Sequence, residues 1–202
     1  MKKKLIIICL IAILILPLTG CGEKKDTRKD AIKFKESYES LNKKTMDNGE
    51  LYRTITIADE NPIIYTTYEE VQEKIANNEN FIVYFGSYKS EWSRSVVPYL
   101  LEQAKTQGID TIYYVDITPA DDTGTKAISI EDQYYQDVVR ELDVPELTDS
   151  TLAVFIGGEL RGKTDGISEK QTSGNMDITG EMINDMKSLF KDIYITYNSN
   201  RN

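Results

Sequence analysis

The stretch that decides the fold spans residues 81–98 and reads FIVYFGSYKSEWSRSVVP. Its first five residues are aromatic or β-branched, which is typical of a buried strand. A short polar turn follows. Ser90 then suits the N-cap of a helix, and Glu91 suits its first turn because acidic side chains favour the positive end of the helix dipole. The sequence therefore predicts a buried strand that leads directly into a helix at Ser90.

The other elements follow from apolar periodicity, capping residues and turn signals on either side of this stretch. Thr67 and Glu70 form a capping-box pattern, and Gly157-Gly158 separates the two halves of a hairpin. Their order predicts an α/β domain with a mixed central sheet and helices on both faces, behind an N-terminal helical extension. The expected helices cover residues 31–46, 68–76, 90–108, 131–142 and 179–194, and the expected strands cover 51–57, 81–85, 111–117, 152–156 and 159–163.

Four landmarks in this order resemble the thioredoxin superfamily. The buried strand leads into the active-site turn, Ser90 and Ser93 stand at the two cysteine positions with Trp92 between them, Pro98 matches the helix-kinking proline, and Gly157-Gly158 matches the late hairpin turn. The chain looks most like thioredoxin-like lipoproteins and bacteriocin-transport-accessory-type proteins of Gram-positive bacteria. The resemblance implies a three-layer thioredoxin-like sandwich over residues 61–195.

The sequence differs from thioredoxins at the positions that carry their redox chemistry. Serine hydroxyls at positions 90 and 93 cannot form a disulfide. The position of the family's cis-proline, whose neighbouring peptide pairs with substrate, is Ser150 preceded by Asp149. A cis bond before a residue other than proline costs about 2.5–4 kcal/mol, so we expect a trans bond here. Tyr84 stands where thioredoxins bury an aspartate.

Ser90, Glu91, Trp92 and Ser93 leave two questions open. The serines could act as nucleophiles with Lys89 as base, but nothing in the sequence desolvates that lysine, and an N-cap role for Ser90 is favoured. Trp92 could contact a partner or pack into the core, and its position in the first helical turn does not decide between the two.

The N-terminus has the pattern of a lipoprotein signal. Three lysines precede an apolar run over residues 5–16, and Leu18-Thr19-Gly20-Cys21 matches a lipobox. An ordinary secretory signal is the alternative. The favoured interpretation makes residues 1–20 a signal peptide and Cys21 a diacylglyceryl-cysteine that anchors the chain at the outer face of the cell membrane. Residues 21–30 would then be a tether, 31–60 a helix and strand extension, and 196–202 a tail.

Composition excludes several function classes. The chain has no histidine, and its two cysteines are Cys9, within the signal, and Cys21. Histidine-based catalysis and thiol chemistry in the mature domain are therefore excluded, and we expect no metal or cofactor. The net charge is −9, or −12 once Lys2, Lys3 and Lys4 are removed, which disfavours nucleic acid. The acidic residues of segment 116–124 lack the ligand spacing of a calcium loop and favour a solvated loop.

The function expected from these observations is a redox-inactive thioredoxin-like lipoprotein. It would bind an extracytoplasmic protein or peptide through the face around Ser90, Trp92, Ser93 and Ser150. The alternative is a thiol-disulfide oxidoreductase of the cell envelope whose cysteine pair is replaced by serine in this sequence. An accessory role in bacteriocin transport or immunity rests on the family resemblance alone.

Overall fold

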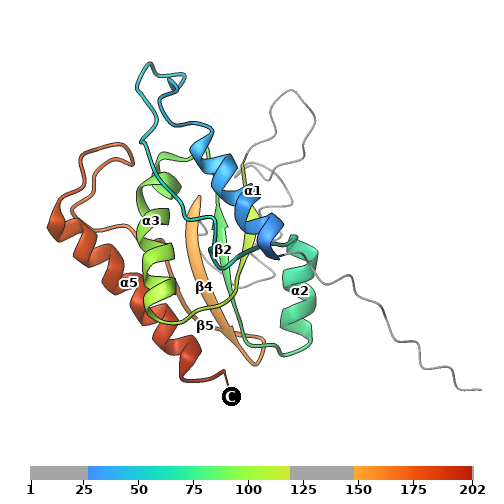
Figure 1. Cartoon of the computed structure of the whole chain (residues 1–202). Helices are drawn as coiled ribbons and strands as arrows, with labels where there is room; N and C mark the ends of the chain where they lie inside the picture. Colours follow the sequence, from blue (N-terminus) through green and yellow to red (C-terminus); the bar gives the residue numbers. More distant parts are fainter. Residues whose placement is uncertain (1–26, 119–147, 202) are drawn as a thin grey trace, which may run out of the picture.

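The computed structural model describes residues 27–118 and 148–201 of the chain as one α/β unit (Figure 1). The elements expected from residues 131–142, and the signal and lipobox residues, lie outside these ranges. The helices are α1 (Thr27–Glu39), α2 (Tyr68–Ala76), α3 (Glu91–Thr106) and α5 (Gly180–Asn198). The strands are β1 (Ile63–Tyr65), β2 (Phe81–Gly86), β3 (Ile112–Asp116), β4 (Ser150–Ile156) and β5 (Glu159–Thr164).

The five strands form one mixed sheet in the order β1-β3-β2-β4-β5. Strands β1, β3 and β2 run parallel, whereas β4 is antiparallel to β2 and β5 is antiparallel to β4. All six residues of β2 are buried, as expected for the central strand of a sheet covered on both faces. Gly157 and Gly158 have φ values of 59° and 76°, the left-handed conformation that a tight two-residue hairpin turn requires.

Helices cover both faces of the sheet, and each face has its own apolar cluster. On one face, α1, α3 and α5 pack around Phe34, Val97 and Phe190 together with the sheet residues Tyr84 and Tyr114. On the other face, α2 packs against side chains such as Phe81, Val83 and Phe155. Alternate residues of β2 point to opposite clusters, as the pleat of a strand dictates. The fold class predicted from the sequence is confirmed.

Local capping signals position three of the helices. Thr67 accepts the backbone N–H of Glu70 in the expected capping box, Ser90 caps α3, and Thr179 caps α5. Pro98 lies inside α3 as expected. These N-termini agree with the sequence prediction because a cap is a local signal that the chain carries at the helix start itself.

Several predicted boundaries are wrong. Helix α1 spans Thr27–Glu39 rather than 31–46, so the predicted tether loses its last four residues to the helix. Helix α5 continues to Asn198, into the predicted tail. Residues 51–57 alternate in polarity but form no strand, apart from an isolated bridge between Leu51 and Thr45. The short strand β1 was not predicted.

In the second half of the stretch 51–57, side chains rather than a neighbouring strand accept the backbone N–H groups. The N–H of Ile55 donates to Oδ1 of Asn42 at 3.0 Å, and the N–H of Ile57 donates to Oε1 of Glu39 at 2.8 Å. Both isoleucines are buried in the cluster beneath α1 and α3. The N-terminal extension is thus part of the same core as the sheet.

Candidate functional site

Ser90 and Ser93, the two serines of the strand–turn–helix stretch, lie in different surroundings. Ser90 is half-buried at the N-cap of α3, where its Oγ accepts the N–H groups of Trp92 at 3.1 Å and Ser93 at 3.2 Å. This confirms the capping role predicted for Ser90. Its hydroxyl oxygen is used to satisfy backbone donors that every helix leaves free at its start.

Ser93 is completely buried. Its Oγ accepts the N–H of Ser87 at 3.1 Å and the hydroxyl of Tyr84 at 3.2 Å, and it donates to the carbonyl oxygen of Asp149. A hydroxyl has one proton and two lone pairs, so these three bonds use its whole hydrogen-bonding capacity. Ser93 therefore joins the end of β2, the start of α3 and the residue before β4.

Tyr84, Ser93 and Ser150 form a buried hydroxyl cluster. The Tyr84 hydroxyl lies 3.4 Å from Oγ of Ser150, which donates to the carbonyl oxygen of Asp165 at 2.9 Å. Tyr84 thus lies beneath Ser93, where counting along the sequence placed it. Burial is the main cause that raises the pKa of Tyr84 to about 12, so the phenol is neutral at ordinary pH. The cluster contains no base that could activate a serine.

The loop before β4 departs from the family pattern as predicted. The structure has no cis peptide bond within the described residues, so the bond between Asp149 and Ser150 is trans. The carbonyl oxygen of Asp149 already accepts a hydrogen bond from Ser93. The carbonyl group of Asp149 is therefore engaged inside the protein.

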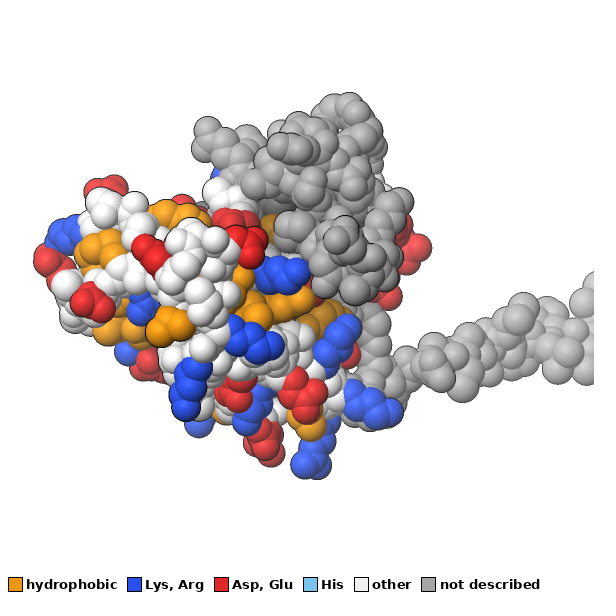
Figure 2. Space-filling view, turned by 90° about the horizontal axis from the view of Figure 1, so that it is seen from above, with side chains coloured by type: hydrophobic (Ala, Val, Ile, Leu, Met, Phe, Trp, Pro, Cys, Tyr) orange, Lys and Arg blue, Asp and Glu red, His pale blue; other side chains and the backbone are white. Residues whose placement is uncertain are grey.

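The predicted binding face must be corrected. Ser93 and Ser150 are both fully buried, so neither reaches a partner. The accessible part is the α3 corner, which we define as residues 88–92, together with the half-buried Asp149. Figure 2 looks onto the end of the molecule at which α3 begins, and apolar side chains are exposed there among charged ones.

Trp92, within the α3 corner, belongs to neither of the two apolar clusters of the described residues. It is half-buried, while its carbonyl oxygen accepts the hydroxyl of Ser95 at 2.7 Å. The packing therefore does not support a core role for Trp92, which was one of the two alternatives that the sequence left open. The indole is placed where a partner could cover its remaining surface.

Arg94 is the residue that sequence reasoning missed. Its guanidinium is buried and donates to the carbonyl oxygens of Tyr38 at 2.6 Å and Arg53 at 2.5 Å, and to Oδ1 of Asn42 at 3.0 Å. It also lies over the ring of Tyr52, 5.4 Å from the centroid. Burial lowers the pKa of Arg94 from its ordinary value. The side chain fastens the N-terminal extension to the first turn of α3.

A second segment packs against the same turn. A Cβ at Gly174 would come within 2.4 Å of Cβ of Glu91 and 2.7 Å of the backbone nitrogen of Trp92, so only glycine fits this approach. Nε2 of Gln171 donates to Oγ of Ser95 at 3.0 Å, and Arg53 donates to the carbonyl oxygen of Gly174 at 3.4 Å. The segment 171–174 therefore covers one flank of the α3 corner.

Two further site predictions fall partly or wholly outside the described residues. Cys21 lies outside them. Of the acidic segment 116–124, the structure describes Asp116, whose Oδ1 accepts the N–H of Thr118 at 3.0 Å at the end of β3. Within the described ranges, no helix is long and apolar enough to cross a bilayer.

Comparison with known proteins gave one kind of match. No protein-family model matches the chain, and a search of curated proteins found no relative. Among solved structures, thioredoxin O2 from Arabidopsis thaliana in its oxidized state is similar, with 17% identity and a TM-score of 0.39 over 66% of this chain and 96% of that chain. The mixed sheet, its helices on both faces and the strand–turn–helix at Ser90 make the fold of the chain thioredoxin-like.

Proposed function

We propose that the chain is a redox-inactive thioredoxin-like lipoprotein that binds an extracytoplasmic protein or peptide at the outer face of the membrane. The proposal that the protein is redox-inactive rests on the burial and hydrogen bonding of Ser93. Its hydroxyl is buried and fully hydrogen-bonded, and it holds the carbonyl group of Asp149. A position that stabilises the scaffold in this way takes no part in exchange with a substrate.

The alternative oxidoreductase fits these surroundings poorly. Restoring two thiols would leave Tyr84 in place of an acid and the peptide between Asp149 and Ser150 in the trans form. The phenol of Tyr84 has a pKa of about 12 and cannot accept a thiol proton near neutral pH. The serines are therefore not the only departure from an active thioredoxin, because Tyr84 and the trans peptide before Ser150 also differ from one.

The α3 corner supplies the binding surface of the proposal. Trp92 and Glu91 lie in the first turn of α3, at its positive end, and Lys89 lies just before the cap. Tryptophan is frequently a dominant contact in protein interfaces because it buries a large area with few rotatable bonds. The membrane part of the proposal rests on the lipobox ending at Cys21.

The proposal is tested by site-specific crosslinking in native cells. A photoreactive phenylalanine at position 92 should yield a discrete crosslinked product, whereas the same group at position 195, a 44%-exposed isoleucine of α5, should not. Asp149→Lys, introduced beside the reactive group, should reduce the product. Equal products from both positions would contradict a specific partner at the α3 corner.

Two companion measurements separate the parts of the proposal. Cys21→Ala should shift the chain from the membrane to the soluble fraction. The double variant Ser90→Cys with Ser93→Cys should not reduce a disulfide substrate such as insulin above the unaltered protein. Reduction at the rate of an active thioredoxin would restore the oxidoreductase alternative.

A further inference from the structure

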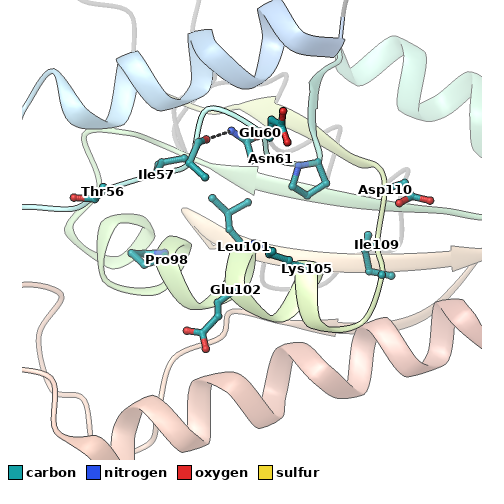
Figure 3. A pocket seen from close by; sticks show the side chains of 13 residues that line it. Thr56, Ile57, Glu60, Asn61, Pro98, Leu101, Glu102, Lys105, Ile109 and Asp110 are labelled. Atoms are coloured by element: carbon teal, nitrogen blue, oxygen red, sulfur yellow. Dashed lines mark hydrogen bonds between the residues drawn. The ribbon is translucent and has the colours of Figure 1, made fainter.

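A groove of about 630 Å³ lies between the extended segment 56–62 and the C-terminal half of α3 (Figure 3). Its lining includes the buried Ile57 and Ile109 and the half-buried Pro98 and Leu101. We define these four apolar residues as the floor of the groove. The volume falls in the range of sites that hold a small ligand or a short peptide segment.

The rim of the groove carries mostly negative charge. Glu60, Glu102, Lys105 and Asp110 are exposed lining residues. Glu102 is neutralised by Lys187, with 2.6 Å between Nζ and Oε1. Within the described residues, neither Glu60 nor Asp110 has an ion-pair partner.

The end of α3 adds to this negative field. Lys105 and Gly108 line the groove where α3 ends, and the carbonyl end of a helix has a partial negative charge. The ammonium group of Lys105 and the guanidinium of Arg201, which donates to the carbonyl oxygen of Gly108 at 3.5 Å, offset the field of the helix end. Among the described residues, Glu60 and Asp110 are the lining carboxylates left without an ion-pair partner. A ligand at this rim is favoured if it is positively charged.

We propose that this groove binds a peptide segment in which a lysine or arginine lies next to large apolar side chains. The apolar side chains would cover the floor, and the cation would face Glu60 and Asp110. Charge complementarity selects this occupant over a second copy of the chain, because two copies with a net charge of −9 each repel one another. The groove and the α3 corner lie at different ends of α3, so this inference does not rest on the function proposed above.

The test uses the full chain in a non-ionic detergent and titrates it with short synthetic peptides by fluorescence anisotropy. A peptide alternating leucine and lysine should bind, and peptides alternating leucine with glutamate or serine with lysine should bind at least about tenfold more weakly. Glu60→Lys combined with Asp110→Lys should weaken binding of the leucine–lysine peptide by about tenfold. Ala58→Trp, which places a ring in the groove without changing charge, should abolish most of the binding.

Matched controls keep the test specific. Glu73→Lys with Asp192→Lys makes the same charge change on exposed positions of α2 and α5. Thr54→Trp adds a ring at an exposed position just before the segment 56–62, outside the lining residues. Both controls should bind like the unaltered chain. Binding that ignores Ala58→Trp, or that falls equally in the controls, would overturn the proposal. Self-association abolished by Ala58→Trp, without peptide binding, would overturn it in favour of a second copy.

Discussion

The α3 corner and Ser93 of the hydroxyl cluster lie within one turn of each other at the start of α3, yet their surroundings differ. In the α3 corner, Ser90 and Trp92 are half-buried and the cap leaves surface available to a partner. In the hydroxyl cluster, Ser93 is fully buried and each of its hydrogen-bonding groups has a protein partner. The same amino acid at two equivalent motif positions therefore closes one region and leaves the other open.

Thiol accessibility should show the largest difference between the two regions. In a chain that begins at Gly22 and so lacks other cysteines, a thiol introduced by Ser90→Cys should react rapidly with a chromogenic disulfide reagent. A thiol introduced by Ser93→Cys should react about a thousandfold more slowly, because labelling must await an opening that costs roughly 4 kcal/mol. Rates measured under native conditions and in urea give the comparison. Similar native rates would show that the cluster is open to solvent.

Replacing the buried guanidinium should give the largest loss of stability. Arg94→Met removes hydrogen bonds to the carbonyl oxygens of Tyr38 and Arg53 and to Asn42, and leaves these acceptors buried. We expect the free energy of unfolding to fall by about 4 kcal/mol, measured by urea denaturation. The control Arg161→Met removes an exposed ion pair with Glu159 and should cost less than about 1 kcal/mol. A small effect of Arg94→Met would mean that the other contacts of the extension hold it in place without this guanidinium.

Alkaline pH should destabilise the protein through its buried phenols. The pKa of Tyr84 is about 12 in the folded protein against 10.0 ordinarily, so its contribution to stability is complete below pH 10 and is lost as the pH rises toward 12. Two pKa units correspond to about 3 kcal/mol. Tyr84→Phe should make the fall in stability across this range shallower by about that amount, as followed by unfolding at a series of pH values. An unchanged slope would contradict a buried, neutral Tyr84.

The smallest expected effect is the difference in lost stability between alanine variants of the two serines. Ser93→Ala leaves the N–H of Ser87 and the carbonyl oxygen of Asp149 without their partner and should cost about 2 kcal/mol. Ser90→Ala removes only an N-cap and should cost about 1 kcal/mol. Thermal denaturation of the two variants side by side makes the measurement. A larger loss for Ser90→Ala would reverse the assignment of the two regions.

The features that the sequence predicted correctly are those determined by residues close together in the chain. The strand before Ser90, the cap at Ser90 and the Gly157-Gly158 turn are all local signals, and all are confirmed. The strand β1 was missed because three residues show no clear period and its pairing with β3 joins distant parts of the chain. Residues 51–57 were misread because alternation indicates which side chains are buried, and not what satisfies the backbone.

The candidate site was predictable in position but not in exposure. Counting along the chain placed Tyr84 beneath Ser93, and the structure agrees. Burial of Ser93 and Ser150 depends on contacts with Asp149 and Asp165, which no local pattern encodes. The sequence holds one hint of Arg94, since this charged residue lies three positions before Val97 and so shares its helix face with an apolar side chain. Its partners in the N-terminal extension could not be inferred from that position.

If Cys21 carries the proposed lipid anchor, the early start of α1 limits the distance between the domain and the membrane. Because the helix begins at Thr27, only residues 22–26 separate it from Cys21. Even fully extended, a linker of this length spans no more than about 20 Å. If Cys21 carries the proposed anchor, the domain is confined to within roughly one domain diameter of the lipid surface. Its partner must then be embedded in that membrane or arrive at it.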